Sequence, residues 1–211
     1  TGIDVGLNSL MTLSNGQQIE PPEFLRKKEK KLIHEQKRLS RKKKGSGKRN
    51  RQKVKVAKIH RKIRNQRTDF AHKTSRKLVD TYDRIVFEDL QIINMMQNHN
   101  LAKSIADAGW YQLISLTKSK AEYAGKVVEL VNARNTSQNC SICGNSVPKD
   151  LSVRTHSCPF CGLVLDRDHN AAINILNRSN NTVGTTGINA RQGFLSRGSV
   201  QREAQRHLGF G

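Results

Sequence analysis

The chain has 211 residues, of which 38 are Lys or Arg and 17 are Asp or Glu, so its net charge is +21. A charge of this size exceeds what solubility requires and indicates a polyanionic partner, with nucleic acid the expected one. No apolar run approaches the roughly 20 residues of a membrane-spanning helix, and the first residues do not resemble a secretory signal. We therefore expect a cytoplasmic protein without a membrane partner.

The N-terminal segment is expected to form a β-hairpin or the start of a β-meander. Apolar and β-branched residues flank Asn15-Gly16, a dipeptide typical of tight turns, and Pro21-Pro22 ends the segment. Because the chain begins with Thr1 rather than Met, we expect it to be a fragment or to lack an upstream region.

Residues 24–80 hold more than half of the Lys and Arg. The pattern predicts two helices around a flexible tip, "KKKGSGKRN", at residues 42–50. Each helix has one narrow apolar stripe, formed by Leu25, Leu32 and Leu39 on the first and by Val56, Ile59, Ile63 and Phe70 on the second. A solvated helical hairpin without a ligand is one interpretation. The scarcity of neighbouring acids favours contact with phosphates instead.

The rest of the chain predicts strands that alternate with helices. Residues 84–90, "RIVFEDL", and 126–132, "KVVELVN", are typical of buried strands. A long amphipathic helix is expected over 100–125, with Gly125 near its C-terminal cap. A second helix is expected from about Asp168 to Asn177, and a loose tail over 179–211.

All four cysteines lie in one stretch, as two Cys-x-x-Cys pairs separated by 14 residues: Cys140, Cys143, Cys158 and Cys161. Four thiolates at this spacing close a tetrahedral shell around Zn²⁺ and leave no open position, so the sequence predicts a structural zinc site. Two disulfides are the alternative, but they require an oxidising compartment, which nothing in the sequence indicates.

Acidic residues occur at three places where a strand ends or a helix begins: Asp4, Glu88 and the pair Asp166 and Asp168. Nucleases that use two Mg²⁺ ions need carboxylates from separate elements that converge at one end of a sheet. Each acid alone has an ordinary explanation as a turn residue, a surface charge or a helix cap. Their joint placement beside apolar strands in a very basic chain favours a hydrolytic site.

The sequence resembles the C-terminal half of the OrfB/TnpB family, the RNA-guided nucleases of bacterial insertion sequences, which are related to type V CRISPR effectors. The resemblance covers residues 1 to about 178, in the expected order. It is carried by "GIDVGLNSLMTLSNG", "VFEDL", "LAKSIADAGWYQLISLTKSKAEYAG", "RNTSQNCSICG" and "CPFCGLVLDRDHNAAINI".

The resemblance implies an α/β, RNase H-like fold of the RuvC type, with a mixed sheet, flanking helices, a basic helical hairpin insertion and a four-cysteine zinc-ribbon insertion. It implies that Asp4, Glu88 and Asp168 bind Mg²⁺ or Mn²⁺ and are catalytic. The resemblance places Asp168, rather than Asp166, in the family's catalytic position, two residues before Asn170 and shortly ahead of Ala171 and Ala172. These alanines are small, which would let their helix lie close to the sheet. Asp166 is expected to be a supporting or a surface residue, and Asp89 is a weaker rival of Glu88.

The expected domain organisation follows from the same resemblance. A RuvC-like core would comprise residues 1–23 and 81–135, with the last RuvC motif and its helix at 166–178; the hairpin insertion would span 24–80, the zinc ribbon 136–165 and the tail 179–211. Full-length relatives carry upstream domains that bind guide RNA and read a short motif next to the target. RNA-guided targeting by this chain alone is therefore not expected.

The sequence thus predicts a metal-dependent DNA endonuclease domain of a transposon-encoded protein, acting near the nucleoid, with DNA and, in the full-length protein, guide RNA as partners. The alternative is a non-catalytic zinc-ribbon module that binds nucleic acid or assists transposition. A tyrosine transposase is disfavoured, because none of Tyr82, Tyr111 and Tyr123 lies beside a His-x-His motif.

Overall fold

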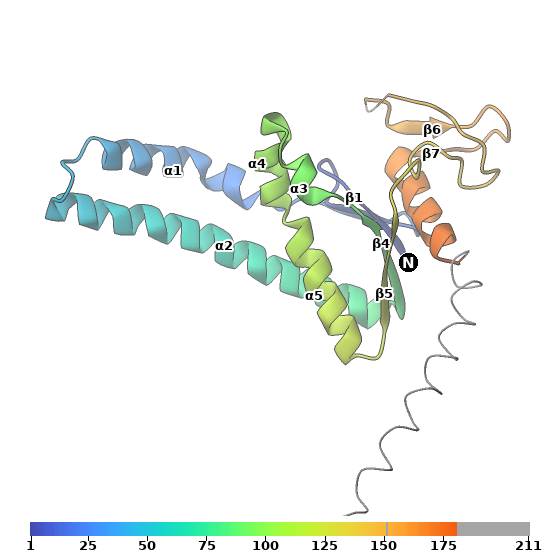
Figure 1. The fold of residues 1–211 in the computed structure, drawn as a ribbon, viewed down its shortest axis with the longest axis horizontal. Coiled ribbons are helices and arrows are strands. Elements are labelled where there is room, and N and C mark those ends of the chain that lie inside the picture. Colours follow the sequence, from blue (N-terminus) through green and yellow to red (C-terminus); the bar gives the residue numbers. More distant parts are fainter. Residues whose placement is uncertain (151, 181–211) are drawn as a thin grey trace, which may run out of the picture.

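The computed structural model describes residues 1–150 and 152–180. Its centre is a five-stranded sheet with the order β3-β2-β1-β4-β5 (Figure 1). The strands are β1 (Gly2–Val5), β2 (Met11–Leu13), β3 (Gln18–Ile19), β4 (Arg84–Asp89) and β5 (Val127–Asn132). The first three form an antiparallel meander around the Asn15-Gly16 turn, whereas β1, β4 and β5 are parallel.

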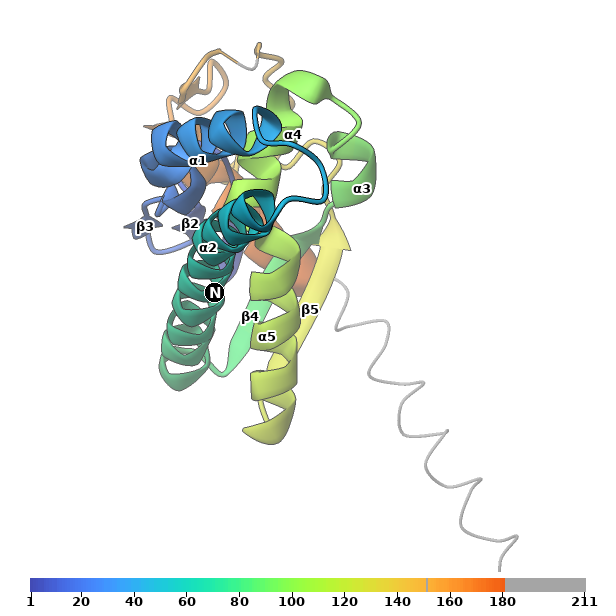
Figure 2. The same ribbon diagram turned by 90° about the vertical axis from the view of Figure 1, so that its left-hand side faces the viewer.

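Helices cover both faces of this sheet (Figures 1 and 2). On one face lie α2 (Gly47–Thr81) and α5 (Trp110–Tyr123). They bury Ile3, Ile85 and Phe87, each 0% exposed, in the main core. On the other face lies a helix over 167–180. The RNase H-like α/β fold expected from the sequence is confirmed.

The helix over 167–180 lies very close to β1 at Gly2. A Cβ atom built on Gly2 would clash with the carbonyl oxygen of Ala172 and would lie 2.6 Å from the backbone nitrogen of Leu176. Ala171 and Ala172 are buried at this contact. Small side chains on the helix and a glycine on the strand therefore permit the close approach, as the sequence indicated.

The basic hairpin consists of α1 (Phe24–Ser40) and α2, joined through the residues between them. It projects from the sheet in Figure 1, and its 35-residue second helix would be about 50 Å long at 1.5 Å per residue. Its apolar stripe is thin, with Leu32 and Ile63 buried and Phe24 packed edge-on against Phe70 at 6.1 Å between ring centroids. No described helix has the length and apolar character needed to cross a membrane.

Three elements differ from the sequence-based expectation. The single helix predicted over 100–125 is two helices, α4 (His99–Ala108) and α5, because Gly109 between them adopts a left-handed φ of 67°. β5 is half exposed rather than buried, since it is an edge strand. The last helix begins at residue 167 and includes Ser179, which is buried. Residues 181–211, most of the predicted loose tail, lie outside the described residues.

The cysteine region forms a small lobe built on a two-stranded sheet, β6 (Thr155–Ser157) and β7 (Val164–Asp166). It lies beside the N-terminal end of the last helix in Figure 1. A short helix, α3 (Ile92–Met95), follows β4 and lies near the tip of β5 in Figure 2.

Candidate active site and metal centre

Strands β1 and β4 place Asp4 and Glu88 side by side. Ile3 pairs with Phe87 in the parallel register, and Asp4 and Glu88 are the next residue on each strand. Because side chains alternate across a sheet, both carboxylates face away from the α2–α5 core and toward the last helix. By the same alternation, Asp89 faces the opposite side.

Asp168 reaches this region from the first turn of the last helix. Asp166, just before the helix, accepts hydrogen bonds from the backbone N–H groups of Asp168 and His169, at 2.9 and 3.0 Å. Asp166 is therefore the N-cap residue of the helix, and the side chain of Asp168 is not used for capping. His169 also contacts the carbonyl oxygen of Ser14 at 3.1 Å, so the helix is tied to the β-meander.

The three carboxyl groups share one electrostatic environment. Burial, and then the negative charges of Glu88 and Asp168, raise the pKa of Asp4 well above its usual range. Burial also raises the pKa of Glu88, although the bond from Thr136 opposes this. Burial and the charge of Asp166 raise the pKa of Asp168, which forms an ion pair with Arg154 at 3.6 Å. The repulsion of Asp4 by two neighbouring carboxylates is typical of a cluster suited to a divalent cation.

The chemistry of these residues fits Mg²⁺ or Mn²⁺, which prefer hard carboxylate oxygens. Among the described residues, the cysteines form the group whose ligand atoms all lie within 4.8 Å of one another. The three acids do not belong to that group. In sites with two ions the carboxylates are shared between ions that lie about 3.5–4 Å apart.

Thr136 is a functional candidate that the sequence reasoning missed. Its buried hydroxyl group hydrogen-bonds to Oε1 of Glu88, which is 6% exposed. Thr136 lies on the segment that leads into Cys140, within the motif "RNTSQNC". A buried hydroxyl near a buried carboxylate is not visible in a sequence pattern, because the two residues are 48 positions apart.

Two asparagines of the last helix fasten that same segment. The side-chain amide of Asn174 donates to the carbonyl oxygens of Thr136 and Asn139, at 2.8 and 2.7 Å. Asn170, which is fully buried, donates to Asn139 at 2.8 Å and accepts from the N–H of Ser141 at 2.9 Å. The helix that carries Asp168 is thereby joined to the residues that hold Glu88 and begin the cysteine cluster.

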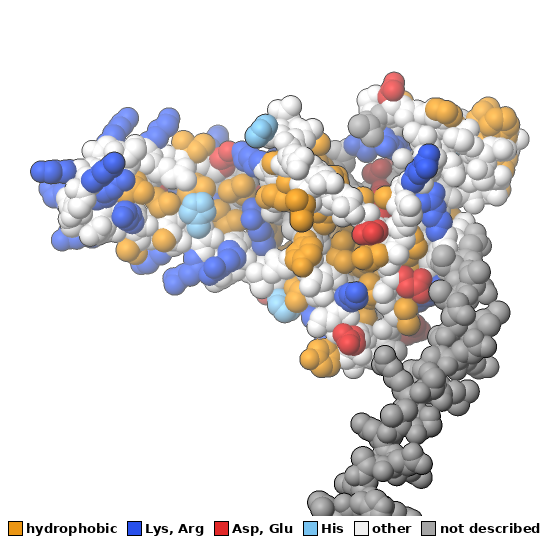
Figure 3. Space-filling model, in the orientation of Figure 1, with side chains coloured by type: hydrophobic (Ala, Val, Ile, Leu, Met, Phe, Trp, Pro, Cys, Tyr) orange, Lys and Arg blue, Asp and Glu red, His pale blue; other side chains and the backbone are white. Residues whose placement is uncertain are grey.

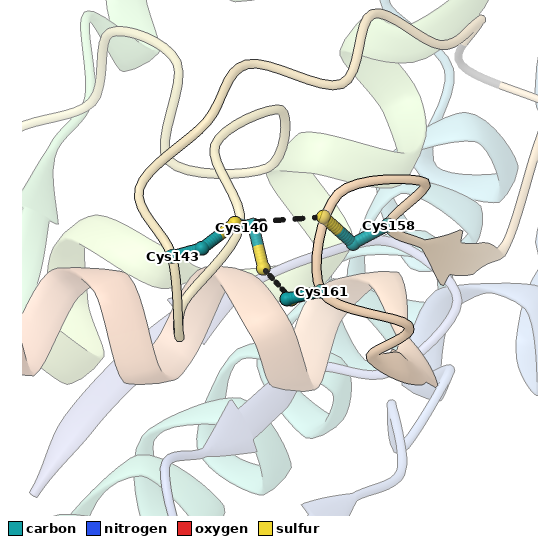
Figure 4. A group of neighbouring side chains, drawn as sticks. All are labelled: Cys140, Cys143, Cys158 and Cys161. Carbon is teal, nitrogen blue, oxygen red and sulfur yellow. Dashed lines mark hydrogen bonds between the residues drawn. The ribbon is translucent and has the colours of Figure 1, made fainter.

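The four cysteines converge as the sequence predicted (Figure 4). The sulfur atoms of Cys140 and Cys161 lie 3.6 Å apart, as do those of Cys143 and Cys158. The edge of a tetrahedron with 2.3 Å Zn–S bonds is about 3.8 Å, so this spacing fits a zinc shell and is much longer than a disulfide bond.

The two knuckles that present these thiols have the same backbone design. Gly144 donates to the carbonyl oxygen of Cys140 at 2.9 Å, and Gly162 donates to that of Cys158 at 3.0 Å. Both glycines adopt a positive φ, of 74° and 75°, which a side chain would strain.

The thiols are already arranged to ionise unequally. Although burial opposes ionisation of Cys158, bonds from the backbone of Cys161 and Phe160 and from neighbouring thiols lower its pKa to about 7. For Cys161, a backbone bond from Leu163 is outweighed by burial and by the surrounding thiols, which raise its pKa to about 12. Four crowded thiols lose their protons together only when a cation compensates the charge.

Positive charge is concentrated on the α1–α2 hairpin, where Lys and Arg side chains cover the projecting end (Figure 3). Residues 24–80 hold 24 of the 38 Lys and Arg but only 4 of the 17 Asp and Glu. The structure thus separates a basic arm from the acidic edge of the sheet.

These features define an α/β protein with a RuvC-like sheet, acids at the carboxyl ends of the interior strands β1 and β4, a third acid on the last helix, and a ribbon-type cysteine cluster. Residues 1–99 match the OrfB_IS605 family model, described as a probable transposase, and residues 110–175 match the Cas12f1-like TNB domain. The chain belongs to the OrfB/TnpB family and carries a Cas12f1-like TNB domain.

Several relatives support this assignment. The chain is 41% identical over 83% of its length to a "Putative RNA-guided DNA endonuclease" of Streptomyces pristinaespiralis, and 35% identical over 83% to "Putative RNA-guided DNA endonuclease InsQ" of Escherichia coli K12. It spans 44% and 48% of those two proteins.

A solved structure shares the fold. The cryo-EM structure of a Cas12f1–sgRNA–target DNA complex matches 82% of this chain and 48% of its own chain, with a TM-score of 0.59 and 19% sequence identity.

Proposed function

We propose that the chain is a metal-dependent nuclease domain that hydrolyses phosphodiester bonds of DNA. The observation that carries this proposal is the placement of Asp4 and Glu88 side by side on β1 and β4. Asp168 is near enough that its charge, after burial and the charge of Glu88, contributes to the raised pKa of Asp4. The resemblance of the sequence to the family implies the same three acids, and the basic arm supplies an affinity for polyanions.

In this mechanism Asp4, Glu88 and Asp168 would hold Mg²⁺ or Mn²⁺, and the bound metal would supply activation of water and stabilisation of the leaving oxygen. Glu88 is held in place by Thr136, so its ligating oxygen is directed before substrate arrives. Asp168 is presented at a fixed point by the capped helix, and Arg154 beside it lies 3.6 Å from its carboxylate. The chain's own contribution is therefore positioning and negative charge.

The cysteine cluster would hold a structural Zn²⁺, for which its sulfur spacing is suited. The basic arm would line the channel for a guide–target duplex or a displaced strand, through contacts to backbone and shape. RNA guidance is proposed for the full-length protein, since two relatives that are named as RNA-guided endonucleases are about twice as long as the part matched here.

The experiment is cleavage of labelled single-stranded and duplex DNA by the purified chain in Mn²⁺. Asp4→Ala, Glu88→Ala and Asp168→Ala are each expected to lower the rate by about 100-fold or more, as loss of a principal electrostatic group does. The control is Asp69→Ala, an exposed acid of α2 that pairs with Lys73. A triad variant with full activity would remove that residue from the proposed site.

A second candidate is a module that binds nucleic acid without cutting it. The observation that favours it is the separation of the basic arm from the acids, because binding would not need them. It predicts salt-dependent binding that is the same in wild type and Asp4→Ala, with no cleavage at any metal concentration.

A further inference from the structure

A cavity of about 320 Å³ lies at the carboxyl end of β4, and the proposed function does not use it. It is enclosed by the end of β4, the start of α3, the outer face of α5 and β5. Figure 2 shows α5 and the tip of β5 flanking this corner, with α3 above it. Glu88 and Asp89 both line it, so it directly adjoins the proposed catalytic edge.

The cavity combines an apolar floor with an exposed aromatic ring. Ile92, Ile114 and Leu130 supply aliphatic surface, and Leu130 is 47% exposed. Tyr111 is 76% exposed, although it is a large side chain that packing would normally cover. Within the described chain its hydroxyl group makes no hydrogen bond, so nothing there accounts for its position.

The cavity is lined by a cation, Lys118, and by the carboxylate of Asp89, and these two side chains form no ion pair with each other. Lys118 lies seven residues after Tyr111, on the same side of α5, and forms no ion pair within residues 1–150 and 152–180. Asp89 contributes an exposed carboxylate at the opposite wall. An aromatic face, a cation and a hydrogen-bond acceptor together suit a nucleotide: the ring stacks on the base, the cation meets a phosphate, and the acceptor receives a base N–H.

We propose that this cavity binds an unpaired nucleobase of single-stranded DNA, next to the phosphate that is cut. The inference rests on the proposed function for its substrate class. Glu88 lines the cavity at the carboxyl end of β4, although its carboxylate is turned toward the last helix. A strand that crosses the carboxyl ends of β1 and β4 would therefore place one phosphate near the acids on one face of the sheet and its neighbouring base against Tyr111 on the other. Stacking there would fix the strand without selecting a sequence, because every base has a flat face.

The test measures binding rather than cleavage and needs no added divalent metal. A labelled short thymidylate strand is compared with a strand of equal length that carries abasic sites. The salt concentration is set high enough to suppress backbone binding. Tyr111→Ala is expected to weaken binding of the thymidylate strand at least about fivefold, which corresponds to one lost stack, and to leave the abasic strand unchanged.

Matched variants sharpen the result. Tyr111→Phe is expected to retain wild-type binding, because it keeps the ring. Tyr123→Ala should change neither strand, since Tyr123 is on the same helix and 92% exposed but does not line the cavity. At lower salt, where phosphate contacts contribute, Lys118→Gln should weaken both strands equally. A strand with 5-iododeoxyuridine should photo-crosslink to the peptide that contains Tyr111.

The outcomes separate this inference from the proposed function. If Tyr111→Ala weakens both strands equally, or no more than Tyr123→Ala does, the cavity is not a base site and the inference is overturned, whether or not DNA is cut. If the base-specific loss appears while the wild-type chain cuts nothing, the cavity binds a base and the nuclease proposal fails.

Discussion

The hydroxyl group of Thr136 holds the carboxylate of Glu88 in a buried position. Thr136→Val preserves shape but leaves the carboxylate without this partner. We expect a loss of about 1–3 kcal/mol in the free energy of unfolding, typical of a buried hydrogen bond to an acidic group, and slower cleavage. Urea denaturation and the cleavage rate are the measurements.

Thr136→Ser is the matched control, because it keeps the hydroxyl group and removes a methyl group. It should recover most of the cleavage rate even if some stability is lost. Equal rates in the Val and Ser variants would show that the hydroxyl group does not position Glu88.

Gly2 is the point where the sheet and the last helix approach most tightly in the first strand. Gly2→Ala places a methyl group against the backbone at Ala172 and Leu176, where neither neighbour is a flexible side chain. We expect a loss of more than about 2 kcal/mol in the free energy of unfolding, as overpacking produces. Thermal denaturation would measure it.

The comparison for Gly2 is Gly47, at the start of α2. A Cβ atom there meets nothing within 4 Å, and alanine favours a helix. Gly47→Ala should therefore be neutral or slightly stabilising. If both variants had the same free energy of unfolding, the close contact at Gly2 would contribute nothing to stability.

Asp4 carries the clearest consequence for pH. Its pKa is raised in the folded state, so between the usual carboxyl range and that raised pKa the folded chain binds a proton that the unfolded chain has lost. The free energy of unfolding should therefore fall as pH rises through this window in the absence of divalent metal.

Asp4→Asn should make that fall smaller, leaving the part that the raised pKa values of Glu88 and Asp168 contribute, and it should make the metal-free chain more stable than wild type at neutral pH. Added Mn²⁺ should stabilise wild type and leave Asp4→Asn almost unchanged, because the ion needs the carboxylate. Urea titrations across pH, with and without Mn²⁺, are the measurement. A pH profile identical in both proteins would mean that folding does not raise the pKa of Asp4.

Among the elements, the last helix joins the acidic cluster to the cysteine cluster. Asn170 and Asn174 connect it to the segment before Cys140. Removal of zinc by a chelator should release this segment, because the cluster no longer fixes Cys140. Amide exchange of Ser141, whose N–H bonds to Asn170, should then accelerate, as followed by hydrogen exchange and mass spectrometry.

The amides of β4 provide the internal reference, since they bond within the central sheet and should remain protected. Unchanged exchange at Ser141 after complete zinc loss would show that the asparagines hold the segment without the metal.

Sequence reasoning recovered the elements whose signal is local. The apolar run of β4, the Asn15-Gly16 turn and the two cysteine pairs each lie within a few residues. It missed the break at Gly109, because one glycine in a helical pattern does not reveal its φ. It also missed Thr136 and the asparagine contacts, which depend on tertiary packing between distant segments. The roles of Asp4, Glu88 and Asp168 stay predictions.

At the scale of the whole molecule, charge is divided between a basic arm and an acidic sheet edge. Replacement of Lys42, Lys43 and Lys44 at the arm's tip by Gln should flatten the dependence of log K on log salt. The slope should change by up to about 3 if each lysine contacts a phosphate. Fluorescence titration at several salt concentrations measures the slope.

Arginine at the same three positions keeps the charge and should keep the slope. A steep slope that survives in the Gln variant would place the phosphate contacts elsewhere on the hairpin.

The three acids come from the first strand, the middle and the last described helix of the chain. During synthesis, Asp168 is added after both other acids and after all four cysteines. A nascent chain is therefore unable to assemble the site until nearly all of its described length has left the ribosome. A protein so basic can meet nucleic acid while still being made, and under the proposed function this order of assembly would delay cleavage until the site is complete.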